Sequence, residues 1–303
     1  MAETDKKGRA GRSGVWGTLA AVPLVVIAAV LLVWRRLAGG DGTDYEVKSF
    51  PLSRKLVVDT GRLGLRRHRV LGLVEVDVTE ARRKIRELRE RTGESLSFTA
   101  FVLASLGHAI EQNKYFHARR DIWGRLILFD KVDCATMIEI ELEGHKFPLA
   151  HVIRGINQRS LRSIHDEIRA VQADPDRSMQ MPPWLMTGFL LMPAALRDVF
   201  YLLVARLPGA FKAQAGTVMV SSVGMFGEGS GWGIGTGSPY TMSLLLGGIA
   251  EKPVFVDGRV EAREVLSLTV ELDHDINDGA PASRFVSRLK GLMEGGYVLE
   301  GIG

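Results

Sequence analysis

The alternating stretch from Leu266 to Asp273 constrains the fold of this chain more than any other feature. Aliphatic residues occupy every second position and polar residues the positions between, which is typical of a strand with one buried face. His274 follows at once, so the strand ends in an imidazole. Gly279 then permits a tight turn, and Pro281 suits the first turn of a helix. The pattern predicts a histidine held between a half-buried strand and a helix.

His274 is a candidate general base, because imidazole has a pKa near neutrality without special tuning. Asp278 lies close enough along the chain to fix the same loop. On spacing alone, a histidine after a strand is more often structural or solvated than catalytic. Spacing therefore leaves both roles open.

A signature surrounds this histidine. The run His274-x-x-x-Asp278-Gly279-Ala280, preceded by Asp273 and followed by Ser283-Arg284-Phe285, resembles the active-site motif of the 2-oxo acid dehydrogenase acyltransferases. The dihydrolipoamide acyltransferases of the complexes usually carry arginine after the motif histidine, and here Asp275 follows. This departure concerns the identity of the substrate more than the chemistry.

Three further segments resemble the same family in its order along the chain. Ser97–Phe101 opens a helix, Gly216–Gly227 looks like the penultimate core strand, and Val256–Gly258 looks like the late hairpin turn. With the motif they span about residues 49 to 298. The resemblance implies an α/β fold, an α+β two-layer sandwich like that of chloramphenicol acetyltransferase, in which helices pack on a mixed sheet.

The resemblance also implies acyl transfer between a thioester and a thiol. The substrate would be coenzyme A or acyl-CoA, or a lipoyl group supplied in trans by a lipoyl-domain protein. In the family, the motif histidine of one subunit meets a strand hydroxyl of its neighbour in a homotrimer or a larger assembly of trimers. That hydroxyl is Ser221 by position, and it would donate to the oxyanion while His274 removes the thiol proton and Asp278 holds the loop. We expect no metal, since the seven histidines show no close ligand pair.

Two other functions stay open. One is a small-molecule O- or N-acetyltransferase, since the motif specifies neither acyl chain nor acceptor. The other is a non-catalytic trimeric membrane scaffold, and retention of His274, Asp278 and Ser221 argues against it. No lipoyl-sized or subunit-binding domain accompanies the catalytic match, so we expect no normal place in a dehydrogenase complex.

The N-terminal region predicts a membrane anchor. Residues 15–34 are twenty residues without a charge, enough to cross a ~30 Å hydrocarbon core as a helix. A cleaved signal peptide is the alternative, but the run is longer than a typical h-region, and Arg35-Arg36 stands where small residues would mark cleavage. We expect a basic tail at 1–14, a single transmembrane helix at 15–34, a linker at 35–48 and the acyltransferase catalytic-like domain at 49–303.

The side of the membrane is less constrained. The flanking charges lean weakly toward a cytoplasmic N-terminus. The family's acyl-CoA and lipoyl substrates are cytoplasmic, which favours a cytoplasmic catalytic domain. We expect the catalytic domain to lie on the cytoplasmic side.

Composition excludes little by itself. The net charge of +4 does not indicate nucleic acid, because several cations lie in the N-terminal tail. Cys134 is the single cysteine, and we expect it to be a small core residue. Ser160 is expected to cap a helix whose His165 is solvated. The loop at 224–237 lacks phosphate-binding patterns and is predicted to be a close-packed turn.

Residues 182–208 form the least family-like part of the chain. They are strongly apolar, but Arg197, Asp198 and Arg206 interrupt them, which argues against a second full membrane span. Two interpretations remain, namely helices packed on the domain and helices lying in the membrane interface. We favour packing.

Overall fold

The computed structural model describes residues 28–34, 45–46, 48–142, 145–178, 181–222, 229–235 and 237–300. The chain divides into two compact units, Met1–Phe50 and Pro51–Gly303. In the first unit residues 28–34 are helical, and the rest of the predicted span at 15–34 lies outside the described residues. Within the described ranges, no single helix is long and apolar enough to cross a membrane.

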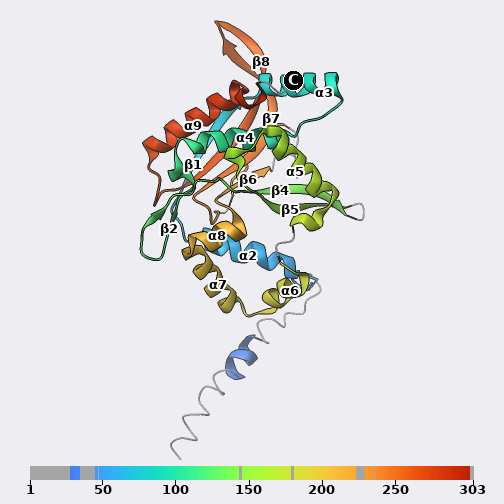
Figure 1. The fold of residues 1–303 in the computed structure, drawn as a ribbon. Helices are drawn as coiled ribbons and strands as arrows, with labels where there is room; N and C mark the ends of the chain where they lie inside the picture. The colour runs from blue at the N-terminus through green and yellow to red at the C-terminus, as the bar shows by residue number, and fades with distance from the viewer. Residues whose placement is uncertain are drawn as a thin grey trace, which may run out of the picture. The chain divides into compact units, whose positions relative to one another are not determined.

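A six-stranded mixed sheet forms the centre of the second unit, in the order β1-β8-β7-β6-β4-β5 (Figure 1). The strand β6 runs parallel to β4 and β7, and the other neighbours are antiparallel. This arrangement confirms the predicted mixed sheet. The strands are β1 (Arg69–Asp77), β4 (Cys134–Leu142), β5 (His145–Ile153), β6 (Val218–Ser222), β7 (Met242–Val256) and β8 (Arg259–Asp273), with β2 (Arg119–Arg120) and β3 (Leu126–Ile127) paired separately.

The long hairpin of β7 and β8 turns where the sequence predicts it. Asp257 has φ 48° and Gly258 has φ 82°, and β7 and β8 pair up to Val256 and Arg259. Two-residue hairpin loops require such left-handed conformations, which aspartate and glycine adopt most readily. The turn fixes the register of β8, and so the level at which His274 leaves the sheet.

Four helices in the described part of the chain cover one face of the sheet and enclose the main core. They are α3 (Thr79–Thr92), α4 (Phe98–Glu111), α5 (Leu161–Ala173) and α9 (Gly279–Glu294), and Figure 1 shows α4, α5 and α9 lying along the strands. The helix α4 is apolar on most of its surface and is buried along nearly its whole length. Ser97 caps α4, and Ser160 caps α5 as predicted.

His165 is a correction to the sequence prediction. It is not solvated but only 5% exposed, because its Nδ1 accepts a hydrogen bond of 3.0 Å from the backbone N–H of Ser97. The imidazole therefore joins α5 to the start of α4. Cys134 is buried and free, as expected.

A second group of helices covers part of the opposite face. They are α2 (Leu52–Gly64), α6 (Pro183–Leu191), α7 (Ala194–Arg206) and α8 (Pro208–Ala215). The buried Arg197 guanidinium pairs with Asp59 of α2 at 2.7 Å, and Lys55 donates to the carbonyl of Leu190 at 3.0 Å. These contacts show that α6 and α7 pack on the domain, as favoured, while their outer side chains, such as Trp184, Leu191 and Leu203, stay exposed. The predicted two-layer sandwich does not include this second group of helices.

The part of β8 from Val265 to Asp273 is buried on both faces, so the prediction of a half-buried strand is wrong. Ser267, Thr269, Glu271 and Asp273 are each at most 2% exposed. The described part of the glycine-rich loop approaches this face, since a Cβ added at Gly247 would lie 2.0 Å from the Gly231 carbonyl oxygen. Within the described part of the loop, residues 229–235, the backbone at Gly229 and Gly231 is close-packed on β7 as predicted.

Candidate active site

His274 stands on the turn that follows β8, and its side chain is exposed. Its backbone N–H donates to the carbonyl of His68 at 2.8 Å. The carbonyl of Asp273 accepts from the N–H groups of Ile276 and Asn277 at 3.2 and 3.0 Å. The backbone is therefore held from both sides while the imidazole stays accessible.

Asp273 supports this turn from below. Its carboxylate is buried and pairs with Arg67. The same carboxylate accepts from the N–H of Asp275 at 3.2 Å. The arginine beside the motif is thus Arg67, and its partner is Asp273.

Asp275 lies among cations. Its carboxylate is 2.8 Å from His68 Nδ1 and 3.6 Å from Arg120. The hydrogen bond to Asp275 raises the pKa of His68, and the same bond lowers the pKa of Asp275. A cation at position 275 would meet Arg120 and His68, which explains why an acid fits there.

Asp278 is exposed at the N-cap of α9, and its side chain makes no capping hydrogen bond. Its carbonyl accepts from the N–H of Ala282 at 3.0 Å. A carboxylate at this place interacts favourably with the helix dipole. Asp278 thus begins α9 immediately after the His274 turn.

Ser221 lies near the end of β6 and is partly buried. Val218 and Val220 point into the main core, so Met219 and Ser221 face the opposite side, toward α2 and α8. Ser221 pairs with Leu245 of β7, and Leu245 pairs with Thr269 of β8. The hydroxyl is thus level with Thr269, not with the end of β8.

One chain does not bring Ser221 and His274 together. Thr269 precedes His274 by five residues, which corresponds to roughly 17 Å along the strand. The serine also lies two strands away from β8. His274 and Asp278 share one loop, and Ser221 belongs to a different part of the same sheet.

A group of arginines near the His274 turn was not predicted. Arg119 is fully buried, donates to the carbonyls of Pro239 and Ala205 at 3.0 and 3.2 Å, and lies 3.3 Å above the Phe211 ring centroid. Burial lowers its pKa to about 9. The runs Arg66-Arg67 and Arg119-Arg120 were visible in the sequence, but arginine pairs are usually solvated.

A cavity of about 340 Å³ lies beside the turn. Arg66, Arg67, Arg120 and Arg206 line it together with Asp273, Asp275, Leu63, Leu202, Ala205 and Ile276. The cations outnumber the acids, so this cavity suits an anionic group.

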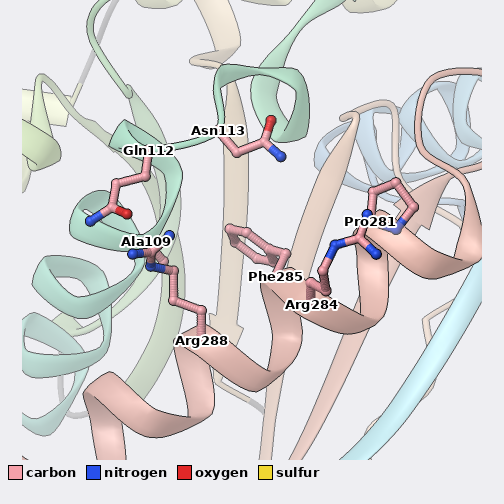
Figure 2. A pocket seen from close by; sticks show the side chains of 7 residues that line it. All are labelled: Ala109, Gln112, Asn113, Pro281, Arg284, Phe285 and Arg288. Carbon is pink, nitrogen blue, oxygen red and sulfur yellow. The ribbon is translucent and has the colours of Figure 1, made fainter.

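A separate cavity of about 240 Å³ lies between the end of α4 and the start of α9. Figure 2 shows Phe285 between Arg284 and Arg288, with Gln112 and Asn113 opposite. Among the described residues that line it there is no histidine, and Ser221 is not one of them. We assign it no catalytic role.

One group of metal-ligand residue types occurs in the described ranges, formed by Glu94, His165 and Asp166. His165 Nδ1 already accepts from Ser97 N–H, and Glu94 pairs with Arg162 at 2.7 Å. Both groups have protein partners, so the cluster has a structural explanation.

Comparison with known proteins shows which family this chain resembles. Residues 210–299 match the model of the 2-oxoacid dehydrogenases acyltransferase (catalytic domain). The chain is 26% identical over 227 residues to the lipoamide acyltransferase component of the Bacillus subtilis branched-chain alpha-keto acid dehydrogenase complex, covering 73% of this chain and 46% of the relative. A yeast dihydrolipoyllysine-residue succinyltransferase component is 38% identical over 79 residues, 26% of this chain and 17% of the relative. The chain thus spans less than half of each of these curated relatives.

Solved structures share the fold. A dihydrolipoamide acetyltransferase from Azotobacter vinelandii superposes with a TM-score of 0.63 at 20% identity, covering 85% of this chain and 96% of that one. A probable dihydrolipoamide acetyltransferase from Listeria monocytogenes gives a TM-score of 0.61 at 20% identity, covering 84% and 95%. This chain is therefore similar to the catalytic domains of the 2-oxoacid dehydrogenase acyltransferases, in sequence most clearly over residues 210–299 and in fold over most of its length.

Proposed function

We propose that this chain is an acyltransferase that moves an acyl group between a thioester and a thiol. The donor is an acyl-CoA or an acyl-lipoyl group, and the lipoyl group comes from another protein. The observation that carries the proposal is the position of His274, whose exposed imidazole sits on a turn fixed by His68 and Asp273. Fixed backbone and free side chain are what a general base requires.

The reaction needs only two side chains of this protein at the reacting atoms. The imidazole of His274 removes the proton of the attacking thiol, and the thiolate adds to the thioester carbonyl. Ser221 donates a hydrogen bond to the oxyanion that forms. When the intermediate collapses, the carbon–sulfur bond to the leaving thiol breaks, and the imidazolium returns its proton to that sulfur.

We propose that the two residues meet across a subunit interface in a homotrimer. The distance between Ser221 and His274 within one chain supports this arrangement. The similar A. vinelandii enzyme supports the choice of residues and not the interface, since a serine, a histidine and, four positions later, an asparagine were investigated for roles in its catalytic mechanism. His274 and Asp278 have the same spacing here. Larger assemblies of trimers would use the same contact.

We also propose that residues 15–34 anchor the protein in a membrane, with the catalytic domain on the cytoplasmic side. Support comes from the twenty uncharged residues, of which residues 28–34 are helical. Acyl-CoA and lipoyl-bearing proteins would be accessible there.

The direct test is acyl transfer by His274→Ala with acyl-CoA donors and dihydrolipoamide as acceptor. We expect a loss of ~10²–10⁴-fold in turnover with folding intact, since general-base catalysis contributes this much. Ser283→Ala, at an exposed position of α9 that carries no proposed role, is the control and should remain near wild type. Wild-type turnover by His274→Ala would disprove the proposal.

A further inference from the structure

The helices α6 and α7 lie outside the segment that matches the family model, which begins at residue 210. With α2 and α8 they stand over the sheet on the face that carries Ser221. The ion pair between Arg197 and Asp59, at 2.7 and 3.2 Å, ties α7 to α2. This ion pair holds α7 against α2, and both helices lie above β4, β6 and β7.

A cavity of about 490 Å³ lies between these helices and the sheet. This volume falls within the ~300–1,000 Å³ of small-molecule sites. Aliphatic and aromatic side chains dominate its walls, including Leu56, Phe189, Phe200 and Val204 from the helices and Met137 and Met219 from the sheet. Methionine adapts its shape to flexible apolar ligands.

Charge is nearly absent from this lining. Glu271 is the one charged residue among the described lining residues. Its carboxylate already lies 3.4 Å from Arg69 and accepts from the N–H of Ser238 at 3.2 Å. The walls therefore offer no unpaired charge to an ionic ligand, and a neutral hydrocarbon chain fits them best.

The cavity reaches the strand neighbours of the proposed oxyanion donor, although Ser221 itself is not among its lining residues. Leu245 lines it and is the partner of Ser221 in the β6–β7 register. Met219 lines it too and precedes Ser221 by two residues on the same face. A thioester whose carbonyl oxygen accepts from Ser221 would thus have its acyl chain at the mouth of the cavity.

We infer that this cavity holds the aliphatic chain of the transferred acyl group, so that the donor is a medium- or long-chain acyl thioester. The inference rests on the proposed function, because it uses Ser221 as the group that positions the carbonyl. The acetyl or succinyl group of the similar enzymes would leave most of the cavity without contact.

The test is a chain-length series of acyl-CoA donors, from acetyl to hexadecanoyl, with the full-length protein. Because each buried methylene is worth ~0.8 kcal/mol, kcat/KM should rise about fourfold per methylene until the cavity is filled. Constant or falling kcat/KM beyond acetyl, with transfer itself intact, would overturn the inference and leave the proposed function standing.

Gly61 offers a variant that fills the cavity with little strain. It lines the cavity from α2, and a Cβ added there meets nothing within 4 Å. Gly61→Leu should shift the preference toward shorter chains, with at least a tenfold fall in the ratio of dodecanoyl to butanoyl transfer. Gly188→Leu is the matched control, since Gly188 lies in α6, has equal open space and does not line the cavity. An equal chain-length profile for both variants would contradict the assignment.

Binding of cis-parinaric acid tests the acyl-chain cavity independently of the proposed acyl transfer. The fluorescent chain should bind to wild type and to His274→Ala, and more weakly to Gly61→Leu than to Gly188→Leu. No binding, or binding that Gly61→Leu leaves unchanged, would overturn the inference. Binding as expected without transfer from any donor would instead refute the proposed function.

Discussion

Asp275 stands where the acyltransferases that this chain resembles usually carry arginine, and its surroundings explain the difference. The carboxylate of Asp275 lies close to His68 and Arg120. Two residues earlier, the carboxylate of Asp273 pairs with Arg67. Asp275→Arg would restore the family's usual residue but place a cation among cations. We expect it to lower the midpoint of thermal unfolding more than Asp275→Asn does. If Asp275→Arg were as stable as wild type, our account of this departure would fail.

The ion pair between His68 and Asp275 predicts that the stability of the fold depends on pH. The pKa of His68 is raised and the pKa of Asp275 is lowered, each by the other, so both are charged between these two values. The stabilisation is lost as pH rises through the raised pKa of His68, and also as pH falls through the lowered pKa of Asp275. Thermal melts of wild type and Asp275→Asn should differ more at pH 6 than at pH 8.5. A difference that grows with pH would contradict the assignment.

His117 predicts lability to acid. It is fully buried, and burial lowers its pKa to about 4. The unfolded state takes up a proton near pH 6.5 while the folded state does not, so stability falls as pH drops from about 6.5 toward 4. At pH 5 the loss is about 2 kcal/mol. Urea unfolding of His117→Gln should show a smaller fall between pH 7 and pH 5 than wild type, and an equal fall would refute this role.

At the scale of elements, the joint between α7 and α2 depends on a buried pair. Arg197 donates to Asp59 and also to the carbonyls of Met192 and Leu190. Arg197→Met would leave the Asp59 carboxylate buried without its partner, which is strongly destabilising. We expect the unfolding temperature to fall by about 10 °C.

The double variant Arg197→Met with Asp59→Leu removes both charges and should recover most of this loss. Differential scanning calorimetry compares the three proteins. No recovery in the double variant would show that the pair does more than compensate its own charges.

Periodicity and turn chemistry could predict much of the fold. The alternation in β8 and the cap at Ser160 are local properties, and each appears where expected. The Asp257-Gly258 turn, which the family resemblance implied, also appears in its place. Burial of the polar face of β8 depends on a distant loop, so alternation alone gave the wrong exposure. His165 was misassigned for the same reason, since its partner is a backbone group of another helix.

The candidate site divides in the same way. His274 and Asp278 could be located because their chemistry lies within one short motif. The pairs of Arg67 with Asp273 and of His68 with Asp275 join the end of β8 and the turn after it to the segment before β1, and no spacing in the sequence reveals that contact. The apolar cavity required the positions of four helices over the sheet, which propensity does not specify.

At the scale of the whole molecule, the proposed anchor predicts membrane association. The full-length protein should stay in the pellet on carbonate extraction, because twenty uncharged residues partition into the bilayer core. A variant that begins near residue 45 is the control and should be released. Equal release of both proteins would refute the anchor.

The subunit interface predicts an oligomer of the catalytic domain. Analytical ultracentrifugation of the protein in detergent should show a trimer, as closed cyclic symmetry would place each His274 against a neighbour's Ser221. A stable monomer that still transfers acyl groups would exclude a shared site.

Activity of mixed trimers tests the central claim most directly. His274→Ala and Ser221→Ala, carrying different affinity tags, are co-expressed, and trimers containing both are isolated. Each mixed trimer has one interface where an intact His274 faces an intact Ser221, so we predict about one third of wild-type turnover, while either variant alone is nearly inactive. Mixed trimers no more active than the two parents would contradict a site formed by His274 of one subunit and Ser221 of the next.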